Sequence, residues 1–399
     1  MDNVAFFLLK FYLFFLFLFL LGRAFVIIIS KYFGQKINTN SKIQGLEIQI
    51  FYPIIGIFFL GNYLYILNYL FPLKSNFSFT IFLFIFFNLI EPFDIKRLSG
   101  VLITLPFYII ILVSSYDINF HYDAGLYHLN SQQWIRESNI IFGFSNIYGA
   151  YGVGSIYEYI SSFLWLDSTF ILIHFTNLIF IGFLYTFMFY NLTKNKNKSL
   201  FAGSFLLIIY SILDNFGYTG GRNGFINIQS IGKQDLPIAV LFVIFGSLLI
   251  ASVLKKSFNE EELLLYSIFS LFIFQLKISG FAISFIYIFY LYSYIKESGK
   301  SFTWLLNRLK FYILLSIIWL AKSIFHTGCL IFPFQASCLT SLSWVNKEYL
   351  RNIENVTVNY SNSYYFGDSL SLWIEKYFEV PINLTIFLNY CISLFFILI

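Results

Sequence analysis

The residues best suited to proton transfer lie together between positions 117 and 128. Two aspartates, Asp117 and Asp123, alternate with His121 and His128 over this stretch. A carboxylate near a low-dielectric boundary binds its proton more tightly than in water, which favours removal of a proton from an acceptor hydroxyl. We therefore take Asp123 as the candidate general base and Asp117 as the second candidate. The ordinary alternatives are a helix cap for Asp123 and a solvated loop position for Asp117.

The residues that follow predict a helix over 122–137 that lies at a membrane interface. Tyr127 and Trp134 would anchor this helix among the lipid headgroups. Asp123 and Tyr127 are four positions apart, so they share one face of the helix. Asp123 would then stand at the first turn of the helix.

Basic side chains in apolar surroundings form a second group of candidates. Lys277 stands between two apolar runs, and Lys322 precedes His326 by four positions, which places both on one helix face. Ionisable residues within membrane segments are costly and are functional by default, and a lipid phosphate is their natural counter-ion. Arg222 lies in a glycine-rich stretch, 217–224, that can form a backbone nest for an anion. Snorkelling to the interface is the alternative for both lysines.

The cysteines and histidines favour a disulfide over a metal centre. Cys329 and Cys338 are nine positions apart in a loop expected to be oxidising, so we expect a structural disulfide there. Cys391 falls in the last apolar run, where we expect it to fill apolar space. His121 and His128 are two helical turns apart, and a metal pair is the alternative for them. No zinc-type spacing is present, so no metal centre and no certain cofactor is expected, and a divalent cation remains open.

The elements that position these residues must be membrane helices. Of the 399 residues, 58% are hydrophobic and only 11% are charged, against about 45–50% and about 25% in ordinary soluble domains. This composition excludes a soluble enzyme, a disordered chain and a nucleic-acid binder. It predicts an all-α polytopic membrane protein in which residues 1–399 form a single integral membrane domain.

We expect about eleven transmembrane helices, because a helix needs about 20 apolar residues to cross a bilayer. The third, sixth and eighth apolar runs are short, and the eighth and ninth are separated by a tight break at Lys277-Ile278-Ser279-Gly280. The predicted spans are 4–29, 48–71, 77–91, 99–116, 168–190, 200–213, 236–254, 263–275, 278–295, 311–326 and 381–399.

The basic residues predict the orientation of these spans. The loops 30–47, 92–98, 191–199, 255–262 and 296–310 carry 14 of the 25 Lys and Arg residues. The positive-inside rule therefore assigns these short loops to the cytoplasm. The N-terminus and two long loops, 117–167 and 327–380, then face outward, and the C-terminus lies inside.

The motifs, taken in order along the chain, resemble a known group of proteins. Tyr122-Asp123 is followed by Leu126-Tyr127-His128 and Trp134, and then by Lys277-Ile278-Ser279. After these, Lys322 leads into Gly328-Cys329, Pro333, Cys338 and Trp344. This order is similar to that of bacterial membrane proteins encoded in surface-polysaccharide clusters, the Wzy-type O-antigen polymerases, and resembles the GT-C type of membrane glycosyltransferases.

The resemblance implies O-antigen or capsule assembly in the bacterial cytoplasmic membrane. The substrate would be a sugar linked to undecaprenyl phosphate or diphosphate, with membrane lipid and a chain-length regulator as partners and no nucleic acid. Asp123 or Asp117 would supply acid–base chemistry, His128 would orient the acceptor or a phosphate, and Lys277, Lys322 and Arg222 would neutralise the phosphates. The chain departs from the expected pattern at Tyr148 and Tyr151, where a His or Arg is expected. A flippase for lipid-linked oligosaccharide is the alternative function, and an acyltransferase or a non-catalytic assembly partner is a third.

Overall fold

The computed structural model describes the chain in six segments. These are residues 2–32, 42–76, 123–165, 170–215, 234–358 and 369–379, together with the single positions 381, 384, 387 and 388. The described residues are mostly helical, and their strands form a two-residue antiparallel hairpin, β1 (Lys42–Ile43) and β2 (Leu46–Glu47). The predicted all-α class therefore agrees with the structure.

Six helices within the described segments are long and apolar enough to cross a membrane. Two further helices, α9 (Lys198–Asn215) and α11 (Glu260–Leu276), accompany them. The six are built on α1 (Asp2–Tyr32), α2 (Tyr52–Asn68), α8 (His174–Thr193), α10 (Asp235–Lys255), α12 (Ala282–Ser298) and α13 (Phe302–Thr327).

The predicted count of eleven spans is not confirmed. The predicted spans 77–91 and 99–116 lie outside the described residues, as does most of 381–399. The predicted break between the eighth and ninth spans is present. There α11 ends at Leu276, Lys277 is extended, and a short turn, η8 (Ile278–Phe281), leads into α12.

The first two helices cross at a pair of glycines. A Cβ atom on Gly22 would lie 2.0 Å from the carbonyl oxygen of Tyr52, and a Cβ on Gly56 would lie 1.9 Å from that of Leu18. Small residues let membrane helices approach until their backbones touch, and van der Waals packing then holds them together. Next to this crossing, the ring of Phe19 meets that of Tyr52 edge-on at 5.3 Å.

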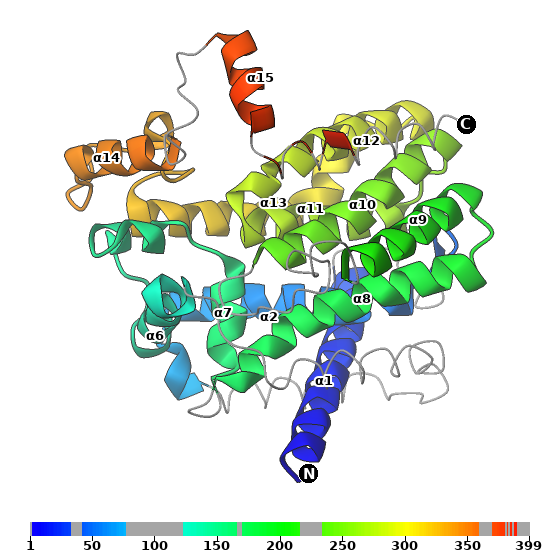
Figure 1. Ribbon diagram of the computed structural model, residues 1–399, viewed down its shortest axis with the longest axis horizontal. Helices are drawn as coiled ribbons and strands as arrows, with labels where there is room; N and C mark the ends of the chain where they lie inside the picture. The colour runs from blue at the N-terminus through cyan, green and yellow to red at the C-terminus, as the bar shows by residue number, and fades with distance from the viewer. Residues whose placement is uncertain are drawn as a thin grey trace.

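The helices α8, α10, α11 and α13 lie side by side, and their short loops gather at one end (Figure 1). We call this the hairpin end, because Gln44 of the hairpin donates to Glu262 at 2.9 Å there. The ion pairs Lys256–Glu297 (3.7 Å) and Arg308–Glu260 (3.4 Å) join helix ends at the same place. The opposite end carries the segment 123–165.

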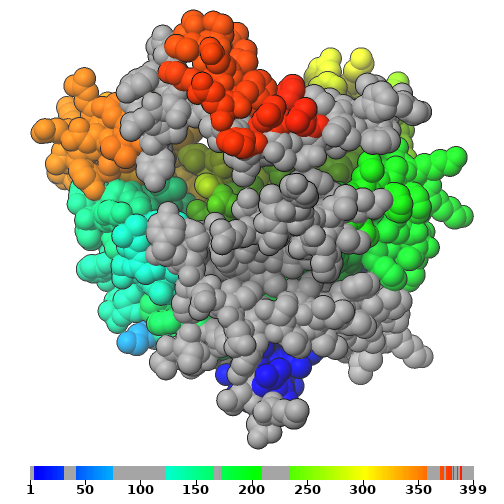
Figure 2. Space-filling model, viewed as in Figure 1, coloured from blue at the N-terminus to red at the C-terminus, as the bar shows by residue number. Residues whose placement is uncertain are grey.

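Both long loops of the prediction contain helices. The first holds the π-helical turn η4 (Ala124–His128), α6 (Leu129–Glu137) and α7 (Ile156–Phe163), and the second holds α14 (Lys347–Val358) and α15 (Leu370–Glu379). In Figure 2 the side chains of α14 lie next to those of the segment 123–165 at one edge of the molecule. The short turns are η1 (Ile48–Phe51), η2 (Leu73–Asn76), η5 (Phe144–Asn146), η6 (Gly149–Gly152), η7 (Ile171–Ile173) and η9 (Gln335–Ser337).

A disulfide fastens the turn that follows α13. Cys329 and Cys338 are bonded to each other, and Cys329 is fully buried with Phe332 and Leu350 in a small second core. Leu350 belongs to α14, so the disulfide turn anchors this helix. Gly328, at φ 79°, ends α13 in the left-handed conformation that glycine adopts at helix C-termini.

Candidate functional site

A polar cavity of about 290 Å³ lies at the end of the molecule opposite the hairpin end. Its wall combines side chains from η4, α6, α7, α10 and α13 with the break between α11 and α12. The charged and polar members of the wall are Asp123, Tyr127, His128, Ser131, Tyr151, Ser155, Glu158, Tyr159, Gln234, Asp235, Lys277, Lys322 and His326.

The first wall of the cavity is the π-helical turn Ala124–His128. π-turns are rare and concentrate at functional sites, because the extra residue redirects the side chains around it. Asp123 occupies the N-cap position of this turn, where its side chain makes no capping hydrogen bond. His128, the last residue of the turn, is 3% exposed.

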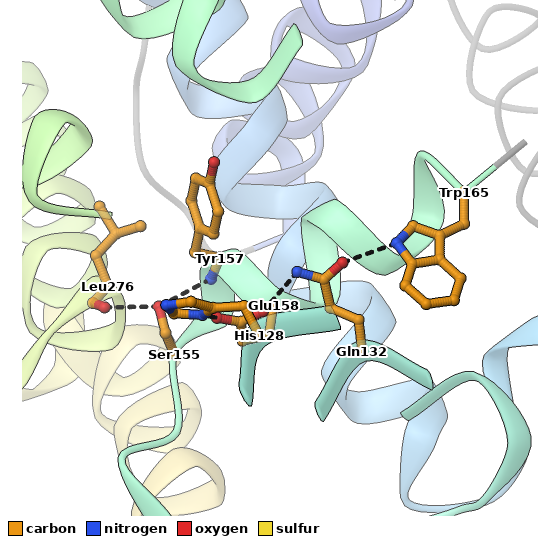
Figure 3. Close-up of polar contacts among 7 residues, drawn as sticks. All are labelled: His128, Gln132, Ser155, Tyr157, Glu158, Trp165 and Leu276. Carbon is orange, nitrogen blue, oxygen red and sulfur yellow. Dashed lines mark hydrogen bonds and ion pairs between the residues drawn. The ribbon is translucent and has the colours of Figure 1, made fainter. Parts of the chain in front are cut away.

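His128 forms the first link of a buried hydrogen-bonded chain (Figure 3). Its Nδ1 lies 2.5 Å from Oε1 of Glu158. The other carboxylate oxygen of Glu158 accepts from Nε2 of Gln132 at 2.7 Å, and Oε1 of Gln132 accepts from the indole N–H of Trp165 at 2.8 Å. Glu158 and Gln132 are 6% and 0% exposed, so solvent does not compete for these bonds.

Glu158 is presented by the start of α7. Ser155 caps this helix by accepting from the backbone N–H of Tyr157 at 3.1 Å, and its hydroxyl donates to the carbonyl of Leu276 at 2.6 Å. Ser155 and Glu158 have the spacing of a capping box, in which the glutamate usually turns back to the cap. Here the carboxylate turns to His128 instead, while Ser155 ties α7 to the end of α11.

Lys322 brings a buried amine to the same cavity. The side chain is 3% exposed, and its Nζ lies 4.3 Å from the ring centre of Trp319 and 4.9 Å from that of Tyr159. Burial raises the pKa of Tyr159 well above its usual value, so this ring stays a neutral face for the cation. Among the described residues, no carboxylate lies within ion-pair distance of Lys322. Gly154 makes room for it, since a Cβ there would lie 2.6 Å from Nζ.

The second lysine of the cavity is already paired. Nζ of Lys277 lies 2.5 Å from Oδ1 of Asp235, at the first residue of α10. Lys277 is therefore not an isolated cation, because a carboxylate 42 positions away in sequence pairs with it, and its role in phosphate binding stays a prediction. Asp235 therefore begins α10 and also forms an ion pair at the cavity wall.

The structure brings six of the predicted site residues together around the cavity: Asp123, Tyr127, His128, Lys277, Lys322 and His326. Trp134 does not line it, since this residue is 41% exposed and its ring packs edge-on against Phe144. Asp117 and Arg222 lie outside the described residues.

Sequence reasoning missed Glu158, Gln132 and Asp235 as members of the site. The capping-box spacing of Ser155 and Glu158 was the available signal for the first of these. No comparable signal in the sequence points to Gln132. As for metals, no group of three His, Cys, Asp or Glu side chains within the described segments could hold an ion.

An apolar bundle of helices with a polar cavity at one end defines an all-α protein of the membrane-embedded class. The chain belongs to the family described as a domain of unknown function, DUF8201, whose model matches residues 4–399. No curated protein and no solved structure matches it.

Proposed function

We propose that the protein transfers a glycosyl group from a polyprenyl-phosphate or polyprenyl-diphosphate carrier during assembly of a bacterial surface polysaccharide. The observation that carries the proposal is Lys322, a cation that is buried at the cavity wall without a carboxylate partner among the described residues. An unpaired buried charge is costly, and an anionic ligand removes that cost. A phosphate suits the site, because it also brings negative charge to where the leaving group forms.

The transfer itself needs few parts. The bond between the sugar carbon and the phosphate oxygen breaks, and the phosphate leaves with the electron pair next to Lys322. The acceptor hydroxyl oxygen forms the new glycosidic bond, and its proton passes to a base on the cavity wall, for which Asp123 and His128 are the candidates. The donor is already activated, so no nucleotide site is required.

The distribution of charge supports an outward-facing cavity. The hairpin end carries the short basic loops, including Lys194, Lys255, Lys296 and Lys300, and such loops stay in the cytoplasm. The cavity lies at the other end, together with the disulfide between Cys329 and Cys338, and disulfides persist in oxidising compartments. We therefore assign the cavity to the outer face of the cytoplasmic membrane, with the N-terminus outside and the C-terminus inside.

The test is the surface-glycan profile of a deletion strain on a silver-stained gel, complemented with wild type, Lys322→Gln or Lys310→Gln. Lys310 is an exposed lysine of the same helix and is the matched control. We expect wild type and Lys310→Gln to restore the glycan and Lys322→Gln to fail.

The pattern of the lost glycan separates the candidate activities. A ladder that collapses to core plus one repeat identifies a polymerase, and the loss of every repeat-bearing band together with a truncated lipid-linked oligosaccharide identifies a single-sugar transferase. A complete oligosaccharide held on the inner leaflet would show a flippase and would overturn the proposal. So would an unchanged profile in the deletion strain.

A further inference from the structure

We infer that His128, held by Glu158, is the general base that removes the proton from the acceptor hydroxyl. This inference rests on the proposed function, because it takes the glycosyl acceptor as the source of that proton. The proton moves from the hydroxyl to Nε2 of His128 as the oxygen forms its bond to the sugar carbon. Glu158 is a positioning residue, and Gln132 and Trp165 fix it in place.

The hydrogen-bonded chain has a direction, and Trp165 sets it. An indole N–H can only donate, so the atom of Gln132 that faces Trp165 at 2.8 Å must be the amide oxygen. The amide nitrogen of Gln132 then faces Glu158 at 2.7 Å and donates to it. The orientation of the Gln132 amide is therefore fixed, because the flipped amide would place its NH₂ group against the indole N–H, where two donors would face each other.

The same argument assigns the proton on His128. An ionised carboxylate only accepts hydrogen bonds, so Nδ1 of His128, at 2.5 Å from Oε1 of Glu158, is the protonated nitrogen. In a neutral imidazole the other nitrogen then carries the lone pair. A carboxylate that fixes the tautomer of a histidine base and stabilises the imidazolium it becomes is the arrangement of a general-base dyad.

The nitrogen of His128 that is unpartnered among the described residues belongs to a side chain that lines the cavity. The His128 ring is part of the cavity wall, and Nε2 is buried without a hydrogen-bond partner among the described residues. Buried polar atoms almost always have a partner, and an exception calls for an explanation. An acceptor hydroxyl in the cavity would supply the missing hydrogen bond to Nε2.

The charged and titratable groups around His128 fit this role. Asp123 and Tyr127 come from its own turn, Glu158 from α7, Lys322 and His326 from α13, and the paired Asp235 and Lys277 from the rim. Among the described residues, Glu158 is the one that pairs with His128 as an ion, so that carboxylate balances the positive charge that His128 gains. The ring of Tyr127 packs against the imidazole, with the ring centres 4.2 Å apart.

Glu158→Gln tests the dyad, because glutamine has nearly the same shape as glutamate but carries no charge. Gln132 still donates toward position 158, so the new amide must turn its oxygen to Gln132 and its nitrogen to His128. That nitrogen donates to Nδ1, which forces the proton of the neutral ring onto Nε2. We expect a loss of transfer of about 10²–10⁴-fold, the usual contribution of a general base.

The double variant Gln132→Glu, Glu158→Gln restores the order of donors. Trp165 donates to the carboxylate at 132, the amide nitrogen at 158 donates to the same carboxylate, and the amide oxygen at 158 faces Nδ1 of His128. We expect the Nδ1–H tautomer to return and glycan synthesis to recover at least in part. Glu137→Gln, at an exposed carboxylate of α6, is the matched control.

The tautomer is read by ¹⁵N NMR of the full-length protein in detergent, labelled at its four histidines. Wild type and the double variant should show a protonated Nδ1 on His128, and Glu158→Gln a protonated Nε2. A protonated Nε2 in wild type, or a wild-type glycan ladder from Glu158→Gln, would overturn the dyad. Binding of undecaprenyl diphosphate by wild type and by Glu158→Gln distinguishes this result from a failure of the proposed function, in which wild type binds no such lipid.

Discussion

Replacing Lys322 with methionine should stabilise the protein and abolish its function together. The amine is 3% exposed, and among the described residues it meets two aromatic rings and no carboxylate. A buried charge without a partner costs about 3–5 kcal/mol, and each desolvated cation–π contact returns about 1–2 kcal/mol. Methionine fills a similar volume without that cost. We therefore expect the free energy of unfolding of Lys322→Met to exceed that of wild type by about 1–2 kcal/mol.

Thermal unfolding in detergent measures this prediction, with and without undecaprenyl diphosphate. A ligand at 100 times its Kd stabilises the native state by about 2.7 kcal/mol. Wild type should show that shift, and Lys322→Met should start from a higher Tm and show none.

Lys310→Met is the control for this experiment, and it should keep both the wild-type Tm and the shift. A Lys322→Met protein that melts below wild type and still responds to the lipid would refute the reasoning, because the amine would then be a structural group that contributes nothing to phosphate binding.

Two further predictions concern the helix packing that holds the cavity. Gly56→Leu should destabilise the protein by about 2 kcal/mol or more, because its side chain meets the backbone oxygen of Leu18, whereas Gly203→Leu faces open space and should leave the Tm unchanged. Asn62→Leu should cost about 1–3 kcal/mol, since Gln275 exchanges two hydrogen bonds with Asn62 and would lose its buried partner. The double variant Asn62→Leu, Gln275→Leu should regain part of the lost free energy of unfolding. Thermal unfolding in detergent measures both changes.

The pattern of apolar residues along the chain was enough to predict most helices, whereas the contacts within the cavity depend on residues far apart in the sequence. Runs of apolar residues placed α1, α2, α10 and α12 close to their observed positions, because a helix buried in lipid must satisfy its own backbone hydrogen bonds whatever surrounds it. The apolar run near 77–116 gave two more spans that lie outside the described residues.

The chemistry of single residues was less predictable. Lys277 reads as an isolated cation in the sequence, and only the fold brings Asp235 to it. Glu158 reads as half of a capping box, and its carboxylate instead meets a histidine 30 positions earlier in the chain. Local spacing determines where a helix begins, but a buried carboxylate goes to the strongest donor within reach, and that donor comes from tertiary packing.

The pairing of charges around the cavity argues for an anion as its occupant. Two of the carboxylates in its wall are already committed, Asp235 to Lys277 and Glu158 to His128. A divalent cation needs several oxygen ligands at once, and these two are not available to it. Lys322 has no ion-pair partner among the described residues and is as deeply buried as His128. Among the described residues, the cavity thus combines a lysine with no carboxylate at ion-pair distance and a histidine nitrogen with no hydrogen-bond donor. A phosphate leaving group and an acceptor hydroxyl would satisfy these two groups.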